Sequence, residues 1–452
     1  MSKYHLIGDF TATEVTSSVA DGQTIVRIPF LSDDFKQQHG ICRAIDDLKK
    51  ANIYPNEFGF DIITLATLVY LADTRISRSF HAQDNWTREI KIELPVFNLV
   101  EWTETEGLFA KILNFLTGDI WEINFTKREV VFAVEGKSKA SFDAVSLFSG
   151  GMDSLIGTIN HLEQQHNIAL VSHAGESFTK NAQSKLLQSF KAQYPSLNPV
   201  SLNLWMVFTK NIIPQGGIEN TTRSRSFLFF AFGLFALSGM DGIGSLDVPE
   251  NSLIALNVPL DDLRIGSHST RTTHPYYMNL WNEALNKLGL SLRVANPYWN
   301  KTKGEMANEC RNKNYLLTTM RISNSCSSPL KARWAKQAPQ HCGYCVPCLI
   351  RRAAMHKAYG FQSDTTTYTI NSIQEIIDAY AKKKGEQLRS FQFAINKVIK
   401  NPKLKTFYIH KSGRLDGDDA YLSELADVYY RGLVEVDDFI KAHLAAEEKE
   451  KE

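Results

Sequence analysis

Residues 149–154 read Ser-Gly-Gly-Met-Asp-Ser, and we call them the glycine loop. A short apolar run precedes them and a helical pattern follows, so the sequence predicts a strand, a tight turn and a helix start. Gly150 and Gly151 allow a sharp turn close to a ligand. Ser149, Ser154 and the free N–H groups of the first helical turn can donate hydrogen bonds to phosphate oxygens. The segment is therefore a candidate phosphate cradle.

Two other nucleotide motifs do not fit this turn. It lacks the Gly-Lys-Ser/Thr end of a Walker loop and the G-x-G-x-x-G spacing of a dinucleotide-binding fold. Taken alone, its residues also fit an ordinary turn with two glycines beside a helix N-cap. Its position after a strand and before a helix favours the phosphate-binding interpretation.

A second group of chemically active residues lies near residue 340. Of the six cysteines in the chain, four fall within 23 residues: Cys326, Cys342, Cys345 and Cys348. We call these four the cysteine cluster. Their sulfurs can converge on one ion, and Gly343 allows a tight turn between them. A closed set of thiolates leaves no open coordination position, so a zinc ion held there would be structural.

Other assignments are compatible with the cysteine cluster. An iron–sulfur cluster can use similar spacing, the cysteines can be free thiols, and His341 can replace Cys326 as a ligand. Clustering in a reducing compartment favours a metal over disulfides. The remaining cysteines, Cys42 and Cys310, lie on helical patterns and are expected to be packing residues.

Further polar residues follow other predicted strands or begin helices. Arginine, lysine and histidine can donate to the phosphates and carboxylate of a ligand. The candidates are His173, Arg225, Arg271, His274 and Lys303. A solvated surface position is the alternative for each. For Lys303, in a first helical turn, the cation gains nothing from the helix dipole, which favours a role in the site.

Two loops extend this candidate site. Residues 173–176 follow a predicted strand, and residues 267–275 are dense in hydrogen-bonding groups and poor in apolar ones. Such segments must face water or a polar ligand. Glu250 and Asn251, which follow another strand, are weaker candidates.

The elements that position these residues are predicted from residue 143 onward. The strands are 144–148, 168–172, 202–207 and 242–246, and the helices are 155–165, 182–194, 226–238, 276–287 and 301–312. This alternation predicts an α/β fold with a parallel sheet covered on both faces. In such sheets ligands bind at the carboxyl ends of strands, near the switch in strand order.

Two flanking regions complete the predicted organisation. Residues 1–140 are expected to form an α+β domain, 141–358 the domain with both motifs, and 359–452 a helical extension. In residues 1–140 we expect strands at 24–28 and 86–94, and Pro95 is expected to end the strand at 86–94. We also expect helices at 41–51, 61–72 and 98–116, and a hairpin of 120–125 with 130–134. In the last we expect helices at 372–384, 387–399 and 418–444, followed by a frayed charged tail.

The first region contains a polar and aromatic stretch. It includes Asp73, Arg78, Trp86 and Arg88. These residues could form a face that docks a protein partner. The alternative is a solvated surface with Trp86 partly in the core.

Composition limits the classes of function. The 452 residues suffice for two or three domains, and 43% hydrophobic with 22% charged residues is ordinary for a globular protein. Lys and Arg total 50 against 49 Asp and Glu, and the net charge of +1 gives no general electrostatic case for binding nucleic acid or a membrane. The N-terminus has no signal-peptide pattern, and the apolar run at 227–237 is too short to span a bilayer. We therefore expect a cytoplasmic protein without membrane or nucleic-acid partners.

The glycine loop and the cysteine cluster, joined in one chain, resemble the 7-cyano-7-deazaguanine synthase family (QueC). In that family a PP-loop domain with an adenine nucleotide α-hydrolase-like fold carries a zinc site of four cysteines near its end. The resemblance covers roughly residues 143–358. The ATP loop of the family corresponds to Ser149, Gly150, Gly151, Asp153 and Ser154, with Met152 at the variable position. A Lys-x-Glu helix start corresponds to Lys303 and Glu305, and an arginine at the start of the apolar helix corresponds to Arg225. The zinc ligands correspond to Cys326, Cys342, Cys345 and Cys348.

The chain also departs from that family, whose enzymes are single domains of about half this length. Its substrate loops, 249–251 and 269–275, differ from the family pattern. The longer layout is similar to that of QueC-like proteins from bacterial anti-phage defence operons such as the Qat system. The resemblance therefore implies adenylation chemistry more directly than it implies a deazaguanine substrate.

The function implied is that of an ATP pyrophosphatase with ATP, Mg²⁺ and Zn²⁺ as cofactors. The catalytic residues would be Ser149, Asp153, Arg225 and Lys303, and the nucleotide and substrate would be bound by residues 149–154, His173, Arg271 and His274. A carboxylate, expected to be that of a 7-deazaguanine, would be adenylated. It would then pass to an amine, either ammonia or a partner protein from the same defence operon.

Two alternatives belong to other functional classes. A PP-loop enzyme acting on tRNA would need a basic stripe and often a reactive cysteine pair, whereas the charges are balanced and four cysteines are assigned to metal. A scaffold of a defence complex would bind ATP without turning it over. Pyrophosphate release distinguishes the scaffold from the enzyme.

Overall fold

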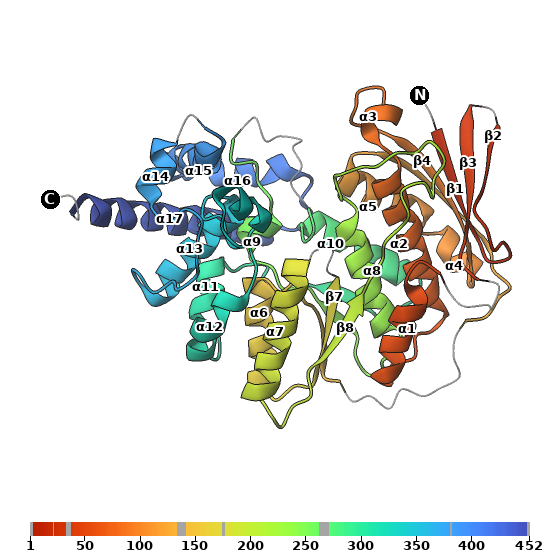
Figure 1. Cartoon of the computed structure of the whole chain (residues 1–452), viewed down its shortest axis with the longest axis horizontal. Helices are drawn as coiled ribbons and strands as arrows, with labels where there is room; N and C mark the ends of the chain where they lie inside the picture. The colour runs from red at the N-terminus through yellow and green to blue at the C-terminus, as the bar shows by residue number, and fades with distance from the viewer. Residues whose placement is uncertain are drawn as a thin grey trace.

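The computed structural model describes residues 3–20, 22–32, 38–132, 142–173, 177–261, 271–379 and 382–449. Of the predicted segments, residues 133–134, 174–176 and 267–270 lie outside these ranges. The fold is mixed α/β, with two largely parallel sheets and a helical C-terminal region (Figure 1). This confirms the predicted class and the predicted helical C-terminal region. None of the helices in the described ranges combines the length and apolar character needed to cross a membrane.

The first sheet is built from the N-terminal region. Its strands are β1 (Lys3–Asp9), β2 (Thr16–Ala20), β3 (Gln23–Pro29), β4 (Glu89–Val96) and β5 (Ile120–Lys127), in the order β2-β3-β1-β4-β5. All neighbours are parallel except β2 and β3. The accompanying helices are α1 (Ile41–Lys50), α2 (Glu57–Arg75), α3 (Arg78–His81), α4 (Leu99–Thr103) and α5 (Glu106–Thr117). The single helix predicted at 98–116 is thus two helices.

Two predictions for this sheet are wrong. Strand β4 continues through Pro95, which pairs with Thr126 of β5. The register of β4 with β1 ends at Glu93, so Pro95 lies where the strand is paired on one side and its missing N–H is tolerated. The predicted hairpin is also absent from the described residues, because residues 120–127 form one strand parallel to β4 and residues 128–132 are not in a strand.

Buried Arg128 explains why the chain leaves the sheet instead of turning back. Its Nη2 lies 2.6 Å from Asp61 Oδ1 and 2.7 Å from Glu57 Oε2, both on α2. The backbone N–H of Phe132 donates to Glu57 Oε1 at 2.8 Å. A buried arginine must be paired, and these carboxylates hold residues 128–132 against α2.

The second sheet contains β6 (Ala144–Leu147), β7 (Ile168–His173), β8 (Val200–Leu204), β9 (Ser245–Asp247) and β10 (Arg293–Ala295). It is parallel throughout, in the order β10-β9-β6-β7-β8. The order reverses between β6 and β9, so the loops after these strands flank the switch point, where α/β sheets bind ligands. The glycine loop follows β6, and residues 248–251 follow β9.

The helices that accompany this sheet agree with the predicted pattern, with additions. They are α6 (Met152–Glu163), α7 (Ser177–Gln193), α8 (Arg225–Leu237), α9 (Ser252–Ala255), α10 (Pro275–Lys287), α11 (Lys303–Asn308), α12 (Lys313–Thr319) and α13 (Val346–Tyr359), with short 3₁₀ turns at Met320–Ile322 and Pro329–Ala335. Helices α9, α12 and α13 and strand β10 were not predicted. Elements α9, α12 and β10 are short, and the periodicity of so few residues carries little information.

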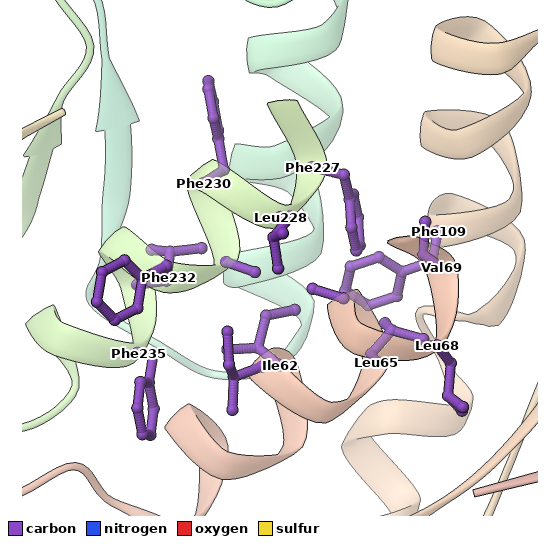
Figure 2. Packing of buried hydrophobic residues seen from close by; sticks show 14 of the residues in the cluster. Ile62, Leu65, Leu68, Val69, Phe109, Phe227, Leu228, Phe230, Phe232 and Phe235 are labelled. Atoms are coloured by element: carbon purple, nitrogen blue, oxygen red, sulfur yellow. The ribbon is translucent and has the colours of Figure 1, made fainter. Parts of the chain in front are cut away.

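The two sheets share one hydrophobic cluster, and α8 lies at its centre. Eleven of the 13 residues of α8 are buried, so the helix is enclosed on nearly all sides. Figure 2 shows Phe227 and Leu228 of α8 directed toward α2, where Ile62 and Leu65 lie, with Phe109 of α5 beside them. The N-terminal region therefore supplies part of the packing around a helix of the second sheet.

Asp73, Arg78 and Arg88 of the polar stretch do not form a solvated surface or a docking face, whereas Trp86 is half-buried, as expected for a side chain partly in the core. Asp73, Arg78 and Arg88 are buried, and Arg88 Nη2 lies 2.9 Å from Asp73 Oδ1 and 2.6 Å from Asp119 Oδ2. Arg78 Nη2 shares the same Asp119 oxygen at 2.6 Å. The charges face each other inside the protein, and only Trp86 of this set is half-buried. Local sequence could not show this, because the decisive partner, Asp119, lies about 30 residues later.

The C-terminal region has its own hydrophobic cluster, which includes residues of α9 and α13. Its helices are α14 (Ile373–Asp378), α15 (Lys383–Lys400), α16 (Leu404–Ile409) and α17 (Asp419–Lys449), with a 3₁₀ turn at His410–Ser412. The predicted frayed tail is partly wrong, because Glu447 accepts hydrogen bonds from Ser372 Oγ and from the N–H groups of Ile373 and Gln374. This carboxylate caps the start of α14.

The contact between α2 and α8 predicts a large cost for truncating Leu65, which is fully buried. Leu65→Ala is expected to lower the free energy of unfolding by about 2–5 kcal/mol, since it leaves a cavity in a core shared by both sheets. Phe80→Ala, at a side chain 78% exposed, is the control and should change it by less than about 0.5 kcal/mol. Urea denaturation measures both, and equal midpoints for the two variants would contradict the shared core.

Candidate functional site

The glycine loop has the predicted strand–turn–helix form. Gly150 has φ +80°, and a Cβ atom there would lie 3.0 Å from Gln183 Cγ, so glycine is favoured by conformation and by space. The Gly151 N–H donates to Ser149 Oγ at 3.2 Å, and Ser154 Oγ donates to the Gly151 carbonyl at 3.1 Å. These bonds hold both serine hydroxyls beside the first turn of α6.

Asp153, in that first turn, forms a buried ion pair with Lys303. Lys303 Nζ lies 3.1 Å from Asp153 Oδ2, and both side chains are more than nine-tenths buried. Asn251 Nδ2 donates to the same Asp153 oxygen at 2.9 Å. Burial acts to raise the pKa of Asp153, but Lys303 and hydrogen bonds from Glu250 and Asn251 outweigh it and lower the pKa. The Asp153 carboxylate is therefore ionised.

Glu250 is the acidic residue next to Asp153, and the sequence alone predicts no catalytic role for it. Asn251 Nδ2 also donates to Glu250 Oε1 at 3.1 Å, and Asn296 Nδ2 donates to the Glu250 carbonyl at 2.8 Å. Burial and the adjacent charge of Asp153 raise the pKa of Glu250 well above its usual value. The two carboxyl groups therefore hold one proton, on Glu250. The sequence marks Glu250 only by its position after a predicted strand, which is β9, the neighbour of β6 in the sheet.

The position of Lys303 is set by the start of α11. Thr302 is the N-cap, with its Oγ1 accepting from the Glu305 N–H at 3.0 Å, while Glu305 Oε2 accepts from the Thr302 N–H at 2.9 Å. Glu305 also pairs with Arg431 of α17 at 2.6 Å. Glu305 thus serves the capping box and an ion pair, whereas Lys303 reaches the glycine loop.

His173 and Arg225 meet at the carboxyl end of β7. Arg225 Nη2 donates to the His173 carbonyl at 3.0 Å, and Arg225 Nε lies 3.4 Å from His173 Nδ1. Burial, followed by the charge of Arg225, lowers the pKa of His173 to about 3, so the imidazole is neutral. The β7 strand end is adjacent to the glycine loop, because Ser172 Oγ donates to the carbonyl of Phe148 at 3.0 Å.

Arg271 and His274 are not brought to the glycine loop by the contacts of the described residues. Arg271 Nη1 donates to the Phe115 carbonyl at 2.9 Å, and its guanidinium lies over the Phe115 ring. His274 caps α10 by accepting from the Tyr276 N–H at 3.2 Å, and its Nε2 lies 3.1 Å from Ser412 Oγ. Both ring nitrogens of His274 thus have partners within the protein. Burial, then Arg271, lowers the pKa of this histidine to about 3.

The four sulfurs of the cysteine cluster lie together in the interior. Their Sγ atoms all lie within 4.8 Å of one another, and the pairs Cys326–Cys345 and Cys342–Cys348 are 3.9 Å apart. Tetrahedral zinc, with Zn–S bonds of about 2.3 Å, would require separations of about 3.8 Å. The cluster is therefore compatible with zinc.

Backbone groups around the sulfurs also suit a metal-bound thiolate set. The Cys345 N–H donates to Cys342 Sγ at 3.3 Å, and the Cys342 N–H donates to Cys326 Sγ at 3.4 Å. Gly343 has φ +88° and leaves no room for a Cβ atom, which would lie 2.0 Å from the Ile370 carbonyl oxygen. Because Cys326 completes the set, His341 is not needed as a ligand, and its Nε2 instead accepts from the Ser325 N–H at 3.2 Å.

The cysteine cluster and the glycine loop are physically connected. Asn324 and Ser325 immediately precede Cys326, and the Asn324 N–H donates to the Gly150 carbonyl at 2.8 Å. The Met152 N–H donates to Ser325 Oγ at 3.3 Å. The chain segment that supplies one sulfur thus forms one wall of the glycine loop.

Comparison with known proteins adds no further information. No family model and no curated protein matches the chain.

Removing one sulfur tests the metal centre and its link to the loop. Cys345→Ser is expected to lower the zinc content from about one ion per chain to near zero and to lower the thermal midpoint, because the remaining thiolates cannot close the tetrahedral set. Metal content is measured by mass spectrometry of the purified protein. Cys310→Ser, at a buried cysteine outside the cluster, is the matched control and should keep its metal. Full metal content in Cys345→Ser would contradict the assignment.

Proposed function

We propose that the chain is an ATP pyrophosphatase that adenylates a carboxylate and passes the acyl group to an amine. The observation that carries this proposal is the glycine loop at the switch point of a parallel sheet, joined to the buried Asp153–Lys303 pair. This supports the resemblance to the 7-cyano-7-deazaguanine synthase family and its PP-loop fold. The cysteine cluster, as a structural zinc site, is the second feature shared with that family.

The glycine loop offers the groups that bind the phosphates. The N–H groups at the start of α6 point out of the helix, and Ser149 and Ser154 lie beside them. Lys303 adds a positive charge that can move from Asp153 to a phosphate oxygen. Arg225 lies at the end of the neighbouring strand and is suited to the α-phosphate or to the substrate carboxylate.

The acidic residues fit a Mg²⁺ ion that arrives with ATP. Asp153 Oδ1 is buried and accepts from no N–H group among the described residues, and the carboxyl of Glu250 lies against Asp153. Carboxylate oxygens are the ligands that Mg²⁺ prefers, so Asp153 and Glu250 would hold it after Glu250 loses its proton. The ion would supply charge neutralisation of the departing pyrophosphate.

The reaction follows from these roles. A carboxylate oxygen of the substrate attacks the α-phosphorus of ATP, the bond to the bridging oxygen breaks, and pyrophosphate leaves with the bonding electron pair. Lys303 and the loop N–H groups stabilise the charge that develops on the phosphate oxygens. An amine then attacks the acyl carbon and releases AMP.

The substrate we propose is a 7-deazaguanine carboxylate, on the strength of the family resemblance. The acceptor is ammonia or an amino group of a protein partner from an anti-phage defence system. The zinc-type site takes no part in bond making, because four thiolates leave no open position.

Pyrophosphate release tests the proposal. The wild type is expected to release pyrophosphate and AMP from ATP in the presence of 7-carboxy-7-deazaguanine and ammonia. Asp153→Asn and Lys303→Met should lower the rate on the order of 100-fold or more, since each removes a group that stabilises the transition state. Lys301→Met is the matched control, because Lys301 is a neighbouring lysine paired with Glu309 and should change the rate by less than about twofold.

The contrary outcome has a specific meaning. Tight ATP binding by the wild type without pyrophosphate release, with or without co-expressed partner proteins, would replace the enzyme with an ATP-binding scaffold. A wild-type rate in Asp153→Asn would show that the glycine loop is a structural turn.

A further inference from the structure

We propose that the C-terminal helix α17 belongs to the active-site machinery and that Glu435 is the residue that positions Lys303. The functional importance of Lys303 rests on the proposed function above. The placement of Lys303 by Glu435 rests on geometry alone. The family resemblance ends near residue 358, so it assigns no role to α17.

Glu435 binds the residues on both sides of Lys303, the side-chain hydroxyl of Thr302 and the backbone N–H of Gly304. Thr302 Oγ1 donates to Glu435 Oε1, and the Gly304 N–H donates to Glu435 Oε2 at 3.2 Å. Glu435 is only 7% exposed, and Lys303 is only 4% exposed. One carboxyl group therefore fixes the residues directly before and after the lysine.

The fit between Glu435 and α11 is close. A Cβ atom on Gly304 would lie 2.6 Å from Glu435 Oε1 and 2.8 Å from Oε2. Glycine at position 304 is thus what allows the carboxyl to reach the helix start. The φ of Gly304 is not in the left-handed region, so space and not backbone conformation explains the glycine.

Helix α11 needs such external support. It has six residues, and a helix of this length is not stable by itself because nucleation is costly. Its N-cap, Thr302, uses one oxygen both to accept from the Glu305 N–H and to donate to Glu435. Removing the Glu435 carboxyl would leave the O–H of Thr302 and the buried N–H of Gly304 without an acceptor, which is costly.

A second contact from the same face of α17 strengthens the hold. Arg431 precedes Glu435 by four residues, so the two side chains project from one side of the helix. Arg431 Nε donates to Glu305 Oε1 at 2.6 Å, and Arg431 Nη2 donates to the Asn300 carbonyl at 2.9 Å. Arg431 thus binds Asn300, which precedes α11, and Glu305 of the capping box, while Glu435 binds on either side of Lys303.

Helix α17 is itself anchored in the protein. Leu433 and Val436, next to these polar residues, are buried in the C-terminal hydrophobic cluster together with Leu349 and Ile350 of α13. Helix α13 begins between the cysteines of the cluster. The position of Lys303 therefore depends on α17, which packs against α13, the helix that carries Cys348.

The first measurement is independent of turnover. Lys303 is buried and ion-paired, so acetic N-hydroxysuccinimide ester should acetylate it slowly in the wild type, with the extent read by peptide mass spectrometry. Glu435→Ala is expected to accelerate acetylation of Lys303 by about tenfold or more, because the start of α11 loses its partner. Glu435→Gln keeps an acceptor for the Gly304 N–H, and its amide can donate to Thr302 Oγ1, so it should remain within about threefold of the wild type. Lys441→Gln, at a lysine 72% exposed on α17, is the control.

The second measurement asks whether Glu435 acts through Lys303. Pyrophosphate release from ATP is compared in Glu435→Ala, Lys303→Met and the double variant. If Glu435 positions Lys303, Glu435→Ala should lower kcat about tenfold or more in the wild-type background and less than about twofold when Lys303 is already methionine.

The outcomes separate this inference from the proposed function. Unchanged acetylation of Lys303 in folded Glu435→Ala would overturn the inference, as would equal losses of kcat in both backgrounds. Should Glu435→Ala fail to fold, acetylation and kcat of Glu435→Asp decide, because its shorter side chain cannot reach both donors; wild-type values there would overturn the inference. If acetylation changes as expected but the wild type releases no pyrophosphate, the positioning role stands and the proposed reaction fails.

Discussion

The ion pair between Asp153 and Lys303 is the contact on which the candidate site depends. Both charges are buried, and a buried ion pair is a weak source of stability because desolvation offsets its attraction. Four separate chain segments nevertheless converge to hold it: the loop after β6, the loop after β9, the start of α11 and helix α17. We propose that these supports hold the pair in place for a bound anion, which would take over Lys303.

The N-terminal region takes part in the same arrangement through α8. Asp73, at the end of α2, accepts from the Ser224 N–H at 2.7 Å with one carboxylate oxygen and from Arg88 with the other. Ser224 is the N-cap of α8, and Arg225 is its first residue. Helix α2 of the N-terminal region therefore fixes where α8 begins, and with it the arginine that meets His173 at the carboxyl end of β7.

The sequence sufficed where the determining residues are neighbours along the chain. The glycine loop, the cysteine spacing and the strands near 144–148 and 168–172 were predicted because turn chemistry, ligand spacing and apolar runs are local. The predictions failed where a residue distant in sequence determines the structure. Pro95 is tolerated in β4 because the pairing with β1 ends before it, and Arg128 leaves the sheet because it pairs with Asp61. The same limit applies to Arg271 and His274, which are predicted as ligand residues although Phe115 and Ser412 engage them. Glu250 was marked only by its place after a strand, and Glu435 had no local pattern to mark it.

In the proposed function, a metal without an open coordination position would still act on the glycine loop, because only a short series of contacts separates them. Helix α13 carries Cys348 and, one turn later, the buried Arg351. Arg351 Nη1 donates to Ser325 Oγ at 3.3 Å, and the same oxygen accepts from the Met152 N–H of the glycine loop. In the proposed function that N–H would face a phosphate, so Ser325, which accepts from it in this structure, would have to yield it to the bound anion. A metal holding Cys326 and Cys348 would fix both the segment that carries Ser325 and the helix that carries Arg351. It would thereby set how readily the loop exchanges an internal oxygen for one from the ligand.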